Sequence, residues 1–300
     1  MDFSIIILSF NSESTIEQTI RSVLPLSDDI HVVDSYSSDG TCGIASRCNA
    51  NVVQHQFTNY SEQRNWAIDN LPLRYKWEFH LDADESVSVR LKNELLSLKK
   101  DTGPTPINGY CISRLVRFQG REIRHGGMFP IWHMRLFRHG LGRCEEREYD
   151  QHFVVDEPTA KLRGWFIDDI RMPLTEWVTR HNRWSDAEVR EVIRNRTETG
   201  IRAKLRGGPL ERKRYLKNWY ARLPYFYRAW LLFIYRYVLR AGFLDGKEGL
   251  VFFFLQTLWF RFLIDAKLFE RRSERSQAAF PIDDLQPVPP NRVPESREMN

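Results

Sequence analysis

Two acidic residues in the first half of the chain have the spacing of a divalent-metal site. Asp82 and Asp84 flank Ala83 and follow the apolar run 77–81, which predicts a buried strand. Ligands of open α/β sheets bind outside the carboxyl ends of the strands, so we expect both carboxylates at a ligand-binding edge. They can hold a hard divalent cation, which bridges the diphosphate of a nucleotide. An isolated Asp-x-Asp triplet is more often a solvated turn or helix cap; the preceding strand favours the metal interpretation.

A third acid, Asp34, ends the predicted strand at residues 30–34. Asp39 or Thr41 is suited to cap the helix that follows, so the segment can also be interpreted as a capped turn. That interpretation explains Asp39 but not Asp34. We expect Asp34 to accept hydrogen bonds from a nucleobase edge or a ribose hydroxyl.

The elements that must position these acids alternate between strand and helix. Strand-like runs lie at residues 4–9, 30–34, 52–55 and 77–81, and helical stretches at 15–24, 41–48 and 61–71. Buried parallel strands appear as continuous apolar runs, and helices supply the crossovers. The order predicts an α/β nucleotide-binding domain. Further on, strand-like pieces at 110–118 and 163–167 precede a helix predicted over residues 173–196.

Composition limits the class of protein. The 300 residues are 42% hydrophobic, enough for an ordinary core, and the formal net charge of +5 favours an anionic partner. The four cysteines show neither a paired metal signature nor a disulfide framework, which fits a reducing cytosolic location. The apolar run after Asp2 is too short for a secretory signal and predicts a first strand.

The composition changes near the carboxyl end. In residues 204–272, Lys and Arg outnumber Asp and Glu and alternate with aromatic and aliphatic residues, as in basic amphipathic helices. A membrane span needs roughly 20 mainly apolar residues. Three arginines interrupt residues 223–244, and the uncharged stretch 249–260 is too short. We expect two helices lying in the membrane interface, joined by a turn at 242–246.

Four motifs follow one another in the first 84 residues: residues 9–11, 33–41, 63–67 and 81–84. In this order they resemble the nucleotide-sugar half of the family-2 glycosyltransferases. Those are inverting enzymes of the GT-A fold, and the sequence resembles the branch that builds bacterial lipopolysaccharide core and exopolysaccharide. The resemblance is closest over residues 3–86, weaker to about residue 190 and architectural beyond.

The resemblance implies roles for the donor-binding residues. Ser9, Asn11 and Asp34 would line the nucleoside pocket, and Arg64 and Asn65 would lie near the donor. The alternatives are that Ser9 and Asn11 only shape a turn and that Arg64 is a surface residue of its helix.

The resemblance also implies the metal ligands. Asp82 would face the ribose or the metal. Asp84 would be the firmest ligand of a Mn²⁺ or Mg²⁺ ion.

Inversion requires a general base that takes the proton of the acceptor hydroxyl. The candidates cluster in residues 144–153, where Asp150 best matches the acid that serves in related enzymes. Glu148 is the alternative, because Gln151 stands where some relatives carry Glu. His152 would orient an acid or contact the acceptor; otherwise this run is a solvated loop.

Residues 180–184 resemble the Gln-x-x-Arg-Trp signature of processive relatives, with Arg180 in place of the Gln. The resemblance implies that Arg183 and Trp184 contact the acceptor or a phosphate, without implying processivity. A helix face that packs Trp177 and Trp184 on the core explains the same residues.

These expectations describe an inverting, metal-dependent glycosyltransferase that moves a sugar from a nucleotide-sugar donor to a lipid-linked or lipopolysaccharide-type glycan. A UDP-sugar is the first candidate for the donor. The GT-A domain would span residues 1–200, with a nucleotide-sugar half (1–105) and an acceptor half (106–200). Basic amphipathic helices (201–272) would hold it at the anionic inner face of the cell membrane, as a peripheral cytoplasmic protein. A disordered tail (273–300) would follow.

Three alternatives stay open. A basic nucleic-acid-binding protein would use the interleaved arginines and aromatics, but it leaves Asp34, Asp82 and Asp84 in a site that repels phosphate. An inactive scaffold would keep the fold without the chemistry. The carboxyl-terminal helices could also bury their aromatics against the catalytic domain instead of touching lipid.

Overall fold

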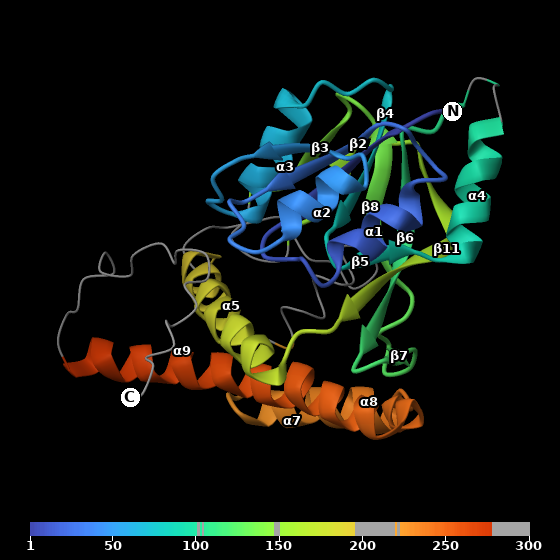
Figure 1. The fold of residues 1–300 in the computed structure, drawn as a ribbon. Helices are drawn as coiled ribbons and strands as arrows, with labels where there is room; N and C mark the ends of the chain where they lie inside the picture. The colour runs from blue at the N-terminus through green and yellow to red at the C-terminus, as the bar shows by residue number, and fades with distance from the viewer. Residues whose placement is uncertain (101–102, 104, 147–150, 196–219, 221–222, 278–300) are drawn as a thin grey trace, which may run out of the picture.

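The computed structural model describes the chain except for residues 101–102, 104, 147–150, 196–219, 221–222 and 278–300. Its centre is a mixed sheet (Figure 1). The strands are β1 (Ser4–Ser9), β2 (Ile30–Asp34), β3 (Asn51–Gln54), β4 (Trp77–Asp82), β5 (Glu85–Val87), β6 (Gly109–Phe118), β7 (Arg121–Ile123), β8 (Ile131–Arg138) and β11 (Thr159–Ile170). Their order is β3-β2-β1-β4-β8-β6-β11-β5, with β7 paired to β6. The predicted α/β fold class is therefore confirmed.

The first half of the sheet is parallel and covered on both faces. Its helices are α1 (Ile16–Val23), α2 (Thr41–Arg47), α3 (Tyr60–Asn70) and α4 (Val89–Lys100). Ile5 and Ile7 of β1 pack with residues of α1, α2 and α4, whereas Ile6 packs with Ala67 and Leu71 at the end of α3. Successive side chains of a strand point to opposite faces, so a strand covered on both faces must be apolar throughout. This explains the continuous run in β1.

The second half of the sheet is mixed. β8 lies antiparallel to both β4 and β6, β6 runs parallel to β11, and β11 pairs antiparallel with β5. A separate two-stranded sheet joins β9 (Gly142–Cys144) to β10 (Phe153–Val155). We did not predict β5, β7, β8, β9 or β10. Four of them have three residues each, and β8 carries polar and charged side chains among its apolar ones, so none gives a clear sequence pattern.

A layer of helices lies beneath the sheet domain in Figure 1. It contains α5 (Leu174–Asn195), α7 (Tyr227–Phe233) continued by the π-helix η1 (Ile234–Leu239), the 3-10 turn η2 (Gly242–Asp245), and a long helix formed by α8 (Gly246–Phe253), the π-helical η3 (Phe254–Trp259) and α9 (Phe260–Gln277). The predicted helix at 173–196 and the two helices joined near 242–246 are confirmed. Most of the predicted tail lies outside the described residues.

The helical layer is fastened to the sheet by apolar packing and hydrogen bonds. Phe252 and Phe253 of α8 pack with Phe118 of β6 and with Met128. The Gly126 amide donates to the Arg240 carbonyl oxygen (2.9 Å). Since a Cβ at Gly126 would lie 2.1 Å from the Phe253 ring, this close approach requires glycine. The two parts therefore form one packed unit.

Within the helical layer, a buried ion pair joins α7 to α9. The Arg228 side chain of α7 donates from Nε to Asp265 Oδ1 of α9 (2.7 Å), and the Phe226 amide donates to Asp265 Oδ2 (2.8 Å). Both partners are almost fully buried. Arg228, one of the three arginines that interrupt residues 223–244, thus faces the neighbouring helix.

One helical run in the described part of the chain, Gly242–Arg271, is long and apolar enough to cross a membrane. It has 30 residues, a mean hydropathy of 1.5 in its apolar window, and 44% of that window is buried within the molecule. The apolar stretch is thus longer than residues 249–260. Its segments α9 and η3 pack against α5 and α7, respectively.

Candidate active site

The strand register brings the predicted acids to one edge of the sheet. Ser9 of β1 pairs with Asp34 of β2, and Leu8 of β1 pairs with Asp82 of β4. Since the three strands are parallel, Ser9, Asp34 and Asp82 all lie at the carboxyl edge, where α/β sheets bind ligands. The structure therefore brings together the residues expected from three separate motifs.

Asp34 is fully buried and anchors the loop that follows β2. Its Oδ1 accepts hydrogen bonds from the hydroxyls of Ser9 (3.0 Å) and Ser37 (2.5 Å), and its Oδ2 from the Ser37 amide (2.8 Å) and Gln54 Nε2 (3.3 Å). Burial acts to raise the pKa of Asp34, but these hydrogen bonds outweigh it and lower the pKa. Asp34 is therefore ionised at neutral pH, and a nucleoside would have to compete with its present donors.

The loops after β1 and β2 are tied to each other. Asn11, with φ of 46°, accepts from the Ser38 amide (2.9 Å) and donates its own amide to the Ser37 hydroxyl (2.8 Å). The Glu13 carboxylate accepts from the Gly40 amide (2.9 Å). Ser9 and Asn11 thus shape this turn, the plainer of the two roles considered for them; both also lie at the edge where the nucleoside is expected.

Asp82 is held between two arginines. Arg64 of α3 donates through Nη2 to Asp82 Oδ1 (3.2 Å), and Arg135 of β8 donates through Nη2 to Asp82 Oδ2 (3.3 Å) and to Glu85 Oε1 (2.6 Å). Burial acts to raise the pKa of Asp82, but the two guanidinium groups lower it far below its usual value. Arg64 is therefore no isolated surface residue. Arg135 was not among the residues that we predicted for the site.

Asp84 has a different environment from Asp82. Among the described residues, no other residue donates a hydrogen bond to its side chain, which is half-buried. Burial, the carboxylate of Asp168 and that of Asp82 together raise the pKa of Asp84 to about 7. A carboxylate that is costly to ionise and lacks a close partner is suited to bind a cation, because the cation would stabilise its charge.

Asp168 is a further acid beside Asp84, and we did not predict it. It lies near the end of β11, opposite Glu85 of β5, and the neighbouring Asp169 amide donates to the Asp84 carbonyl oxygen (3.1 Å). Its carboxylate lies 3.6 Å from Arg114 Nη1. Burial raises the pKa of Asp168 against the opposing effect of Arg114. We call Asp82, Asp84 and Asp168 the acidic cluster; the distance of 84 residues between two of its members hides it in the sequence.

Arg180 of α5 faces the acidic cluster from the helical layer. It lowers the pKa of both Asp84 and Asp168, against the effect of burial, and also acts on Tyr60 of α3. Its guanidinium carbon lies 4.8 Å from the ring centroid of Trp184. Trp184 packs among the apolar residues that join α5 to α9, as the packing interpretation expected. The charge of Arg180 thus acts on these acids, whereas Trp184 belongs to the packing of α5 on α9.

Asn65 fixes the small sheet onto α3. Its side-chain amide donates to the Cys144 carbonyl oxygen (3.0 Å), and its carbonyl oxygen accepts from the Cys144 amide (2.9 Å). Asn65 therefore holds β9 in place beside Arg64, which itself lies over the ring of Phe153 in β10 (5.5 Å). The structure gives Asn65 a positioning role; its expected donor contact stays a prediction.

The expected general bases, Asp150 and Glu148, lie outside the described residues. His152, just after them, has its ring 5.8 Å from the ring of His133 in β8. Burial, with Arg114 and other cations nearby, holds the pKa of His133 well below its usual value. His152 therefore lies near a neutral imidazole. Arg183 lies on α5.

A divalent cation fits the acidic cluster with help from a substrate. The described residues contain no group of three or more His, Cys, Asp or Glu side chains arranged to hold a metal by themselves. Mg²⁺ is commonly bound through one or two carboxylates plus substrate phosphates and water. Asp84 supplies hard oxygen donors of this kind, and the carboxylate of Asp168 lies near enough to act on its charge.

Comparison with known proteins agrees with this geometry. Residues 4–146 match the model of the Glycosyl transferase family 2. An uncharacterized glycosyltransferase of Rickettsia typhi is 29% identical over 119 residues, 40% of each chain, and one of Rickettsia bellii is 35% identical over 92 residues, 31% of each. The chain thus aligns with two fifths or less of the length of these curated relatives. The family match and the mixed sheet agree with the expected GT-A, Rossmann-like architecture.

Two solved structures are similar over part of their length. One is glucosyl-3-phosphoglycerate synthase from Mycobacterium tuberculosis in complex with Mn²⁺, UDP and glucosyl-3-phosphoglycerate, 23% identical with a TM-score of 0.31, covering 39% of this chain and 44% of that one. The other is TarS of S. aureus, 21% identical with a TM-score of 0.29, covering 40% of this chain and 22% of that one.

Proposed function

We propose that this chain is an inverting, metal-dependent family-2 glycosyltransferase. It would transfer a sugar from a nucleotide-sugar donor, for which a UDP-sugar is our first candidate, to a glycan of the lipopolysaccharide or lipid-linked type. The observation that carries the proposal is the acidic cluster at the carboxyl edge of the sheet. Asp82 and Asp84 lie inside the region that matches the family, and Asp168 lies beyond it. Asp34 lies at the same edge, two strands away from Asp82. In this proposal the nucleoside lies near Asp34 and the diphosphate near Asp84.

The residues of the site have separable tasks in this proposal. Arg64 and Arg135 keep Asp82 ionised and fixed in direction. Asp84 would hold a Mn²⁺ or Mg²⁺ ion, which when bound neutralises the charge that develops on the leaving diphosphate. Arg180 adds a positive charge on the side of the site that faces the helical layer.

Transfer with inversion is a single displacement. The oxygen of an acceptor hydroxyl forms a bond to the anomeric carbon while the bond from that carbon to the diphosphate oxygen breaks. The hydroxyl proton passes to a base, for which we propose Asp150, with Glu148 as the alternative. The nucleoside diphosphate keeps the electron pair of the broken bond.

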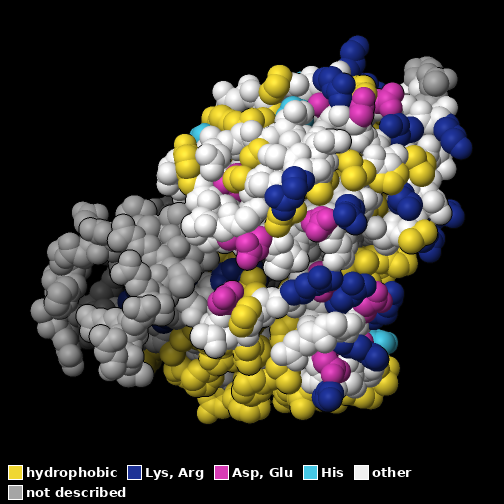
Figure 2. Space-filling view, in the orientation of Figure 1, with side chains coloured by type: hydrophobic (Ala, Val, Ile, Leu, Met, Phe, Trp, Pro, Cys, Tyr) yellow, Lys and Arg dark blue, Asp and Glu magenta, His cyan; other side chains and the backbone are white. Residues whose placement is uncertain are grey.

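We further propose that the protein works at the inner face of the cell membrane as a peripheral protein. Exposed apolar side chains cover the underside of the helical layer, the lower yellow region of Figure 2. We call them the apolar surface: Tyr227, Trp230, Leu231, Ile234, Tyr235, Val238, Leu239, Phe243, Leu244, Leu250, Val251 and Phe254. In α7 and η1 they recur every three or four residues, as on one face of a helix.

An anionic lipid surface suits this face better than protein burial does. The apolar surface points away from the sheet domain, so the interpretation that these aromatics pack on the catalytic domain does not account for them. Exposed Arg240 and Lys247 border it. Apolar side chains flanked by basic ones are typical of helices that lie in an anionic interface.

Nucleotide-induced thermal stabilisation tests the enzyme proposal. A ligand that binds only the folded protein raises its melting temperature, so UDP with Mn²⁺ should stabilise the wild type and Asp34→Asn should weaken the effect. Asp39→Asn, a nearby acid in the loop, is the control. Absence of any shift with nucleoside diphosphates, together with tight salt-sensitive binding of RNA, would instead support the nucleic-acid-binding alternative.

A further inference from the structure

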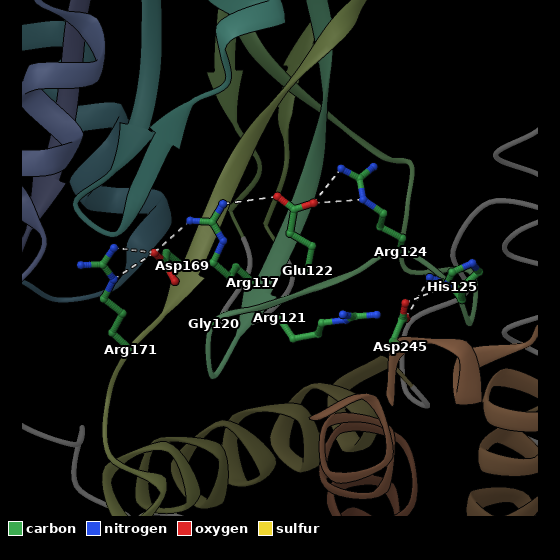
Figure 3. A pocket seen from close by; sticks show the side chains of 9 residues that line it. All are labelled: Arg117, Gly120, Arg121, Glu122, Arg124, His125, Asp169, Arg171 and Asp245. Atoms are coloured by element: carbon green, nitrogen blue, oxygen red, sulfur yellow. Dashed lines mark hydrogen bonds and ion pairs between the residues drawn. The ribbon is translucent and has the colours of Figure 1, made fainter. Parts of the chain in front are cut away.

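A cleft lies on the face of β11 that carries Asp169, opposite to the face that carries Asp168. It measures about 680 Å³ and is formed where the β6–β7 hairpin and the end of β11 meet η2 (Figure 3). Four arginines line it: Arg117, Arg121, Arg124 and Arg171. We call it the arginine cleft.

The register of β6 and β11 separates the arginine cleft from the active site. Asp168 and Asp169 are adjacent in β11, so their side chains point to opposite faces. Asp168 pairs with Arg114 on one face, and Asp169 pairs with Arg117 on the other (3.5 Å between Oδ2 and Nη1). The acidic cluster and the arginine cleft therefore lie on opposite faces of β11 and use different side chains.

Three of the arginines share two carboxylates. Arg124 donates to Glu122 from Nε (3.0 Å) and Nη2 (2.7 Å), and Arg171 donates to Asp169 from Nε (2.9 Å). Arg117 lies between the two acids, 3.3 Å from Glu122. Two negative charges thus face three positive ones before Arg121 is counted.

Arg121 lines the cleft without an acidic partner among the described residues. Within the described part of the chain, its guanidinium has neither an ion pair nor a hydrogen bond, and Figure 3 shows it extending across the cleft toward His125 and Asp245. The carboxylate of Asp245 is occupied by the His125 amide (2.9 Å) and Nδ1 (2.6 Å). The arginine cleft therefore has a net positive charge and a guanidinium available to an anion.

The arginine cleft and the apolar surface meet at η2: Asp245 lines the cleft, and the preceding residue, Leu244, belongs to the apolar surface. Asp245 is buried at the end of η2, whose Phe243 and Leu244 are 49% and 53% exposed. If these two side chains enter the acyl region of a bilayer, the arginine cleft stands at the level of the headgroups. Guanidinium groups bind phosphate through paired N–H donors, which makes phosphate the anion that fits.

We propose that the arginine cleft binds a phosphate group at the membrane surface, namely the phosphodiester of an anionic phospholipid. The inference rests on the proposed contact of the apolar surface with lipid, and it adds a headgroup site that the transfer reaction does not use. A free phosphate compound has the same chemistry, so the experiment must separate the two sources.

The test uses the full chain and three kinds of vesicle: phosphatidylcholine alone, phosphatidylcholine with phosphatidylglycerol, and phosphatidylcholine with oleate at equal surface charge. Arg121→Gln removes the leftover cation without breaking a described ion pair. We expect about fivefold weaker binding to phosphatidylglycerol vesicles, the contribution of one basic residue near such a surface, and a smaller change with oleate. Arg90→Gln, an exposed arginine of α4, should change neither.

A second measurement identifies the source of the phosphate. If inorganic phosphate raises the melting temperature of the wild type but not of Arg121→Gln, while vesicle binding of both is equal, the ligand is a soluble phosphate and the lipid source is overturned. Equal behaviour of Arg121→Gln and Arg90→Gln in both measurements overturns the site. A wild type that ignores every vesicle refutes the membrane proposal itself, and unchanged donor hydrolysis by Arg121→Gln verifies folding.

Discussion

The backbone amide of Asp169 donates a hydrogen bond to the backbone carbonyl oxygen of Asp84, at 3.1 Å. This contact joins the turn after β4 to the end of β11. It brings Asp168 close enough to Asp84 for the two carboxylates to repel each other, which is one reason why the pKa of Asp84 is about 7. The electrostatics of the site thus depend on a main-chain contact between two distant segments.

The raised pKa of Asp84 should make the metal-free protein less stable as the pH rises. Between about pH 4 and pH 7 the folded protein binds a proton at Asp84 that the unfolded chain has released, so the free energy of unfolding falls. We expect a loss of about 1–2 kcal/mol, since solvent screens a half-buried group. Urea denaturation at several pH values measures it. Asp84→Asn should flatten this dependence and abolish metal-dependent transfer; full activity of that variant would remove Asp84 from the site.

Asp168→Asn should lower the pH at which the metal binds. Binding requires an ionised carboxylate and therefore releases a proton. Without the repulsion from Asp168, Asp84 ionises at lower pH, so the midpoint of Mn²⁺ binding should move below 7. Asp169→Asn, on the opposite face of β11, is the matched control and should leave the midpoint in place. Equal shifts in both variants would show that Asp168 acts through the fold and not through its charge.

Arg135→Ala should destabilise the protein most at high pH. Arg135 is 6% exposed and pairs with both Asp82 and Glu85, and its loss leaves buried carboxylates without that partner. We expect a loss of about 3 kcal/mol near pH 8. Burial already raises the pKa of Glu85 well above its usual value, so protonation should recover part of the stability at pH 5. Arg143→Ala removes an exposed pair with Asp69 and should cost less than about 1 kcal/mol.

Asp150→Asn should stop transfer while preserving donor binding. A base that accepts the acceptor proton contributes typically 10²–10⁴-fold to the rate, and nucleotide-induced stabilisation needs no base. Glu148→Gln is the matched substitution. Assay of transfer and of nucleotide-induced melting shifts in both variants decides between them, and the reverse pattern would assign the base to Glu148.

Replacing Trp230, Leu231 and Ile234 by Ser should weaken binding to anionic vesicles more than about tenfold, because the apolar area that enters the lipid is lost. Flotation of the full chain measures it. The control replaces Leu24, Leu141 and Val154, exposed apolar residues outside the helical layer, by Ser. Gel filtration of both variants identifies the other possible occupant of the surface, a second copy of the chain: a wild-type dimer that the first variant converts to a monomer would contradict the membrane proposal.

The first half of the fold could be predicted because its sequence pattern is local. Strands buried on both faces are continuous apolar runs, and the acids at their ends stand in the sequence directly after them. Asp34 and Asp82 were found in this way. Each could be interpreted before any partner was known, because the parallel arrangement alone places strand ends at one edge.

The rest of the site depends on contacts between distant segments. Asp168 follows a strand of mixed character, and its role comes from β11 pairing with β5 and β6. Arg135 lies in β8, where polar and apolar residues do not alternate regularly. Arg180 was set aside as a departure from a motif, although its place on α5 brings its charge to the acids. Contacts between segments that are distant in the sequence leave no local pattern from which they could be predicted.

The packing of α8 on β6 has a consequence for which acceptors the proposed transferase could use. Phe252 and Phe253 fix the helical layer to the sheet, and the hydrogen bond from His125 to Asp245 adds a second attachment. With the apolar surface on a bilayer, the acidic cluster would then stand at a constant height above the lipid. Among glycans that project from a membrane, the protein would therefore favour those whose accepting hydroxyl lies at the same distance from the lipid as the acidic cluster.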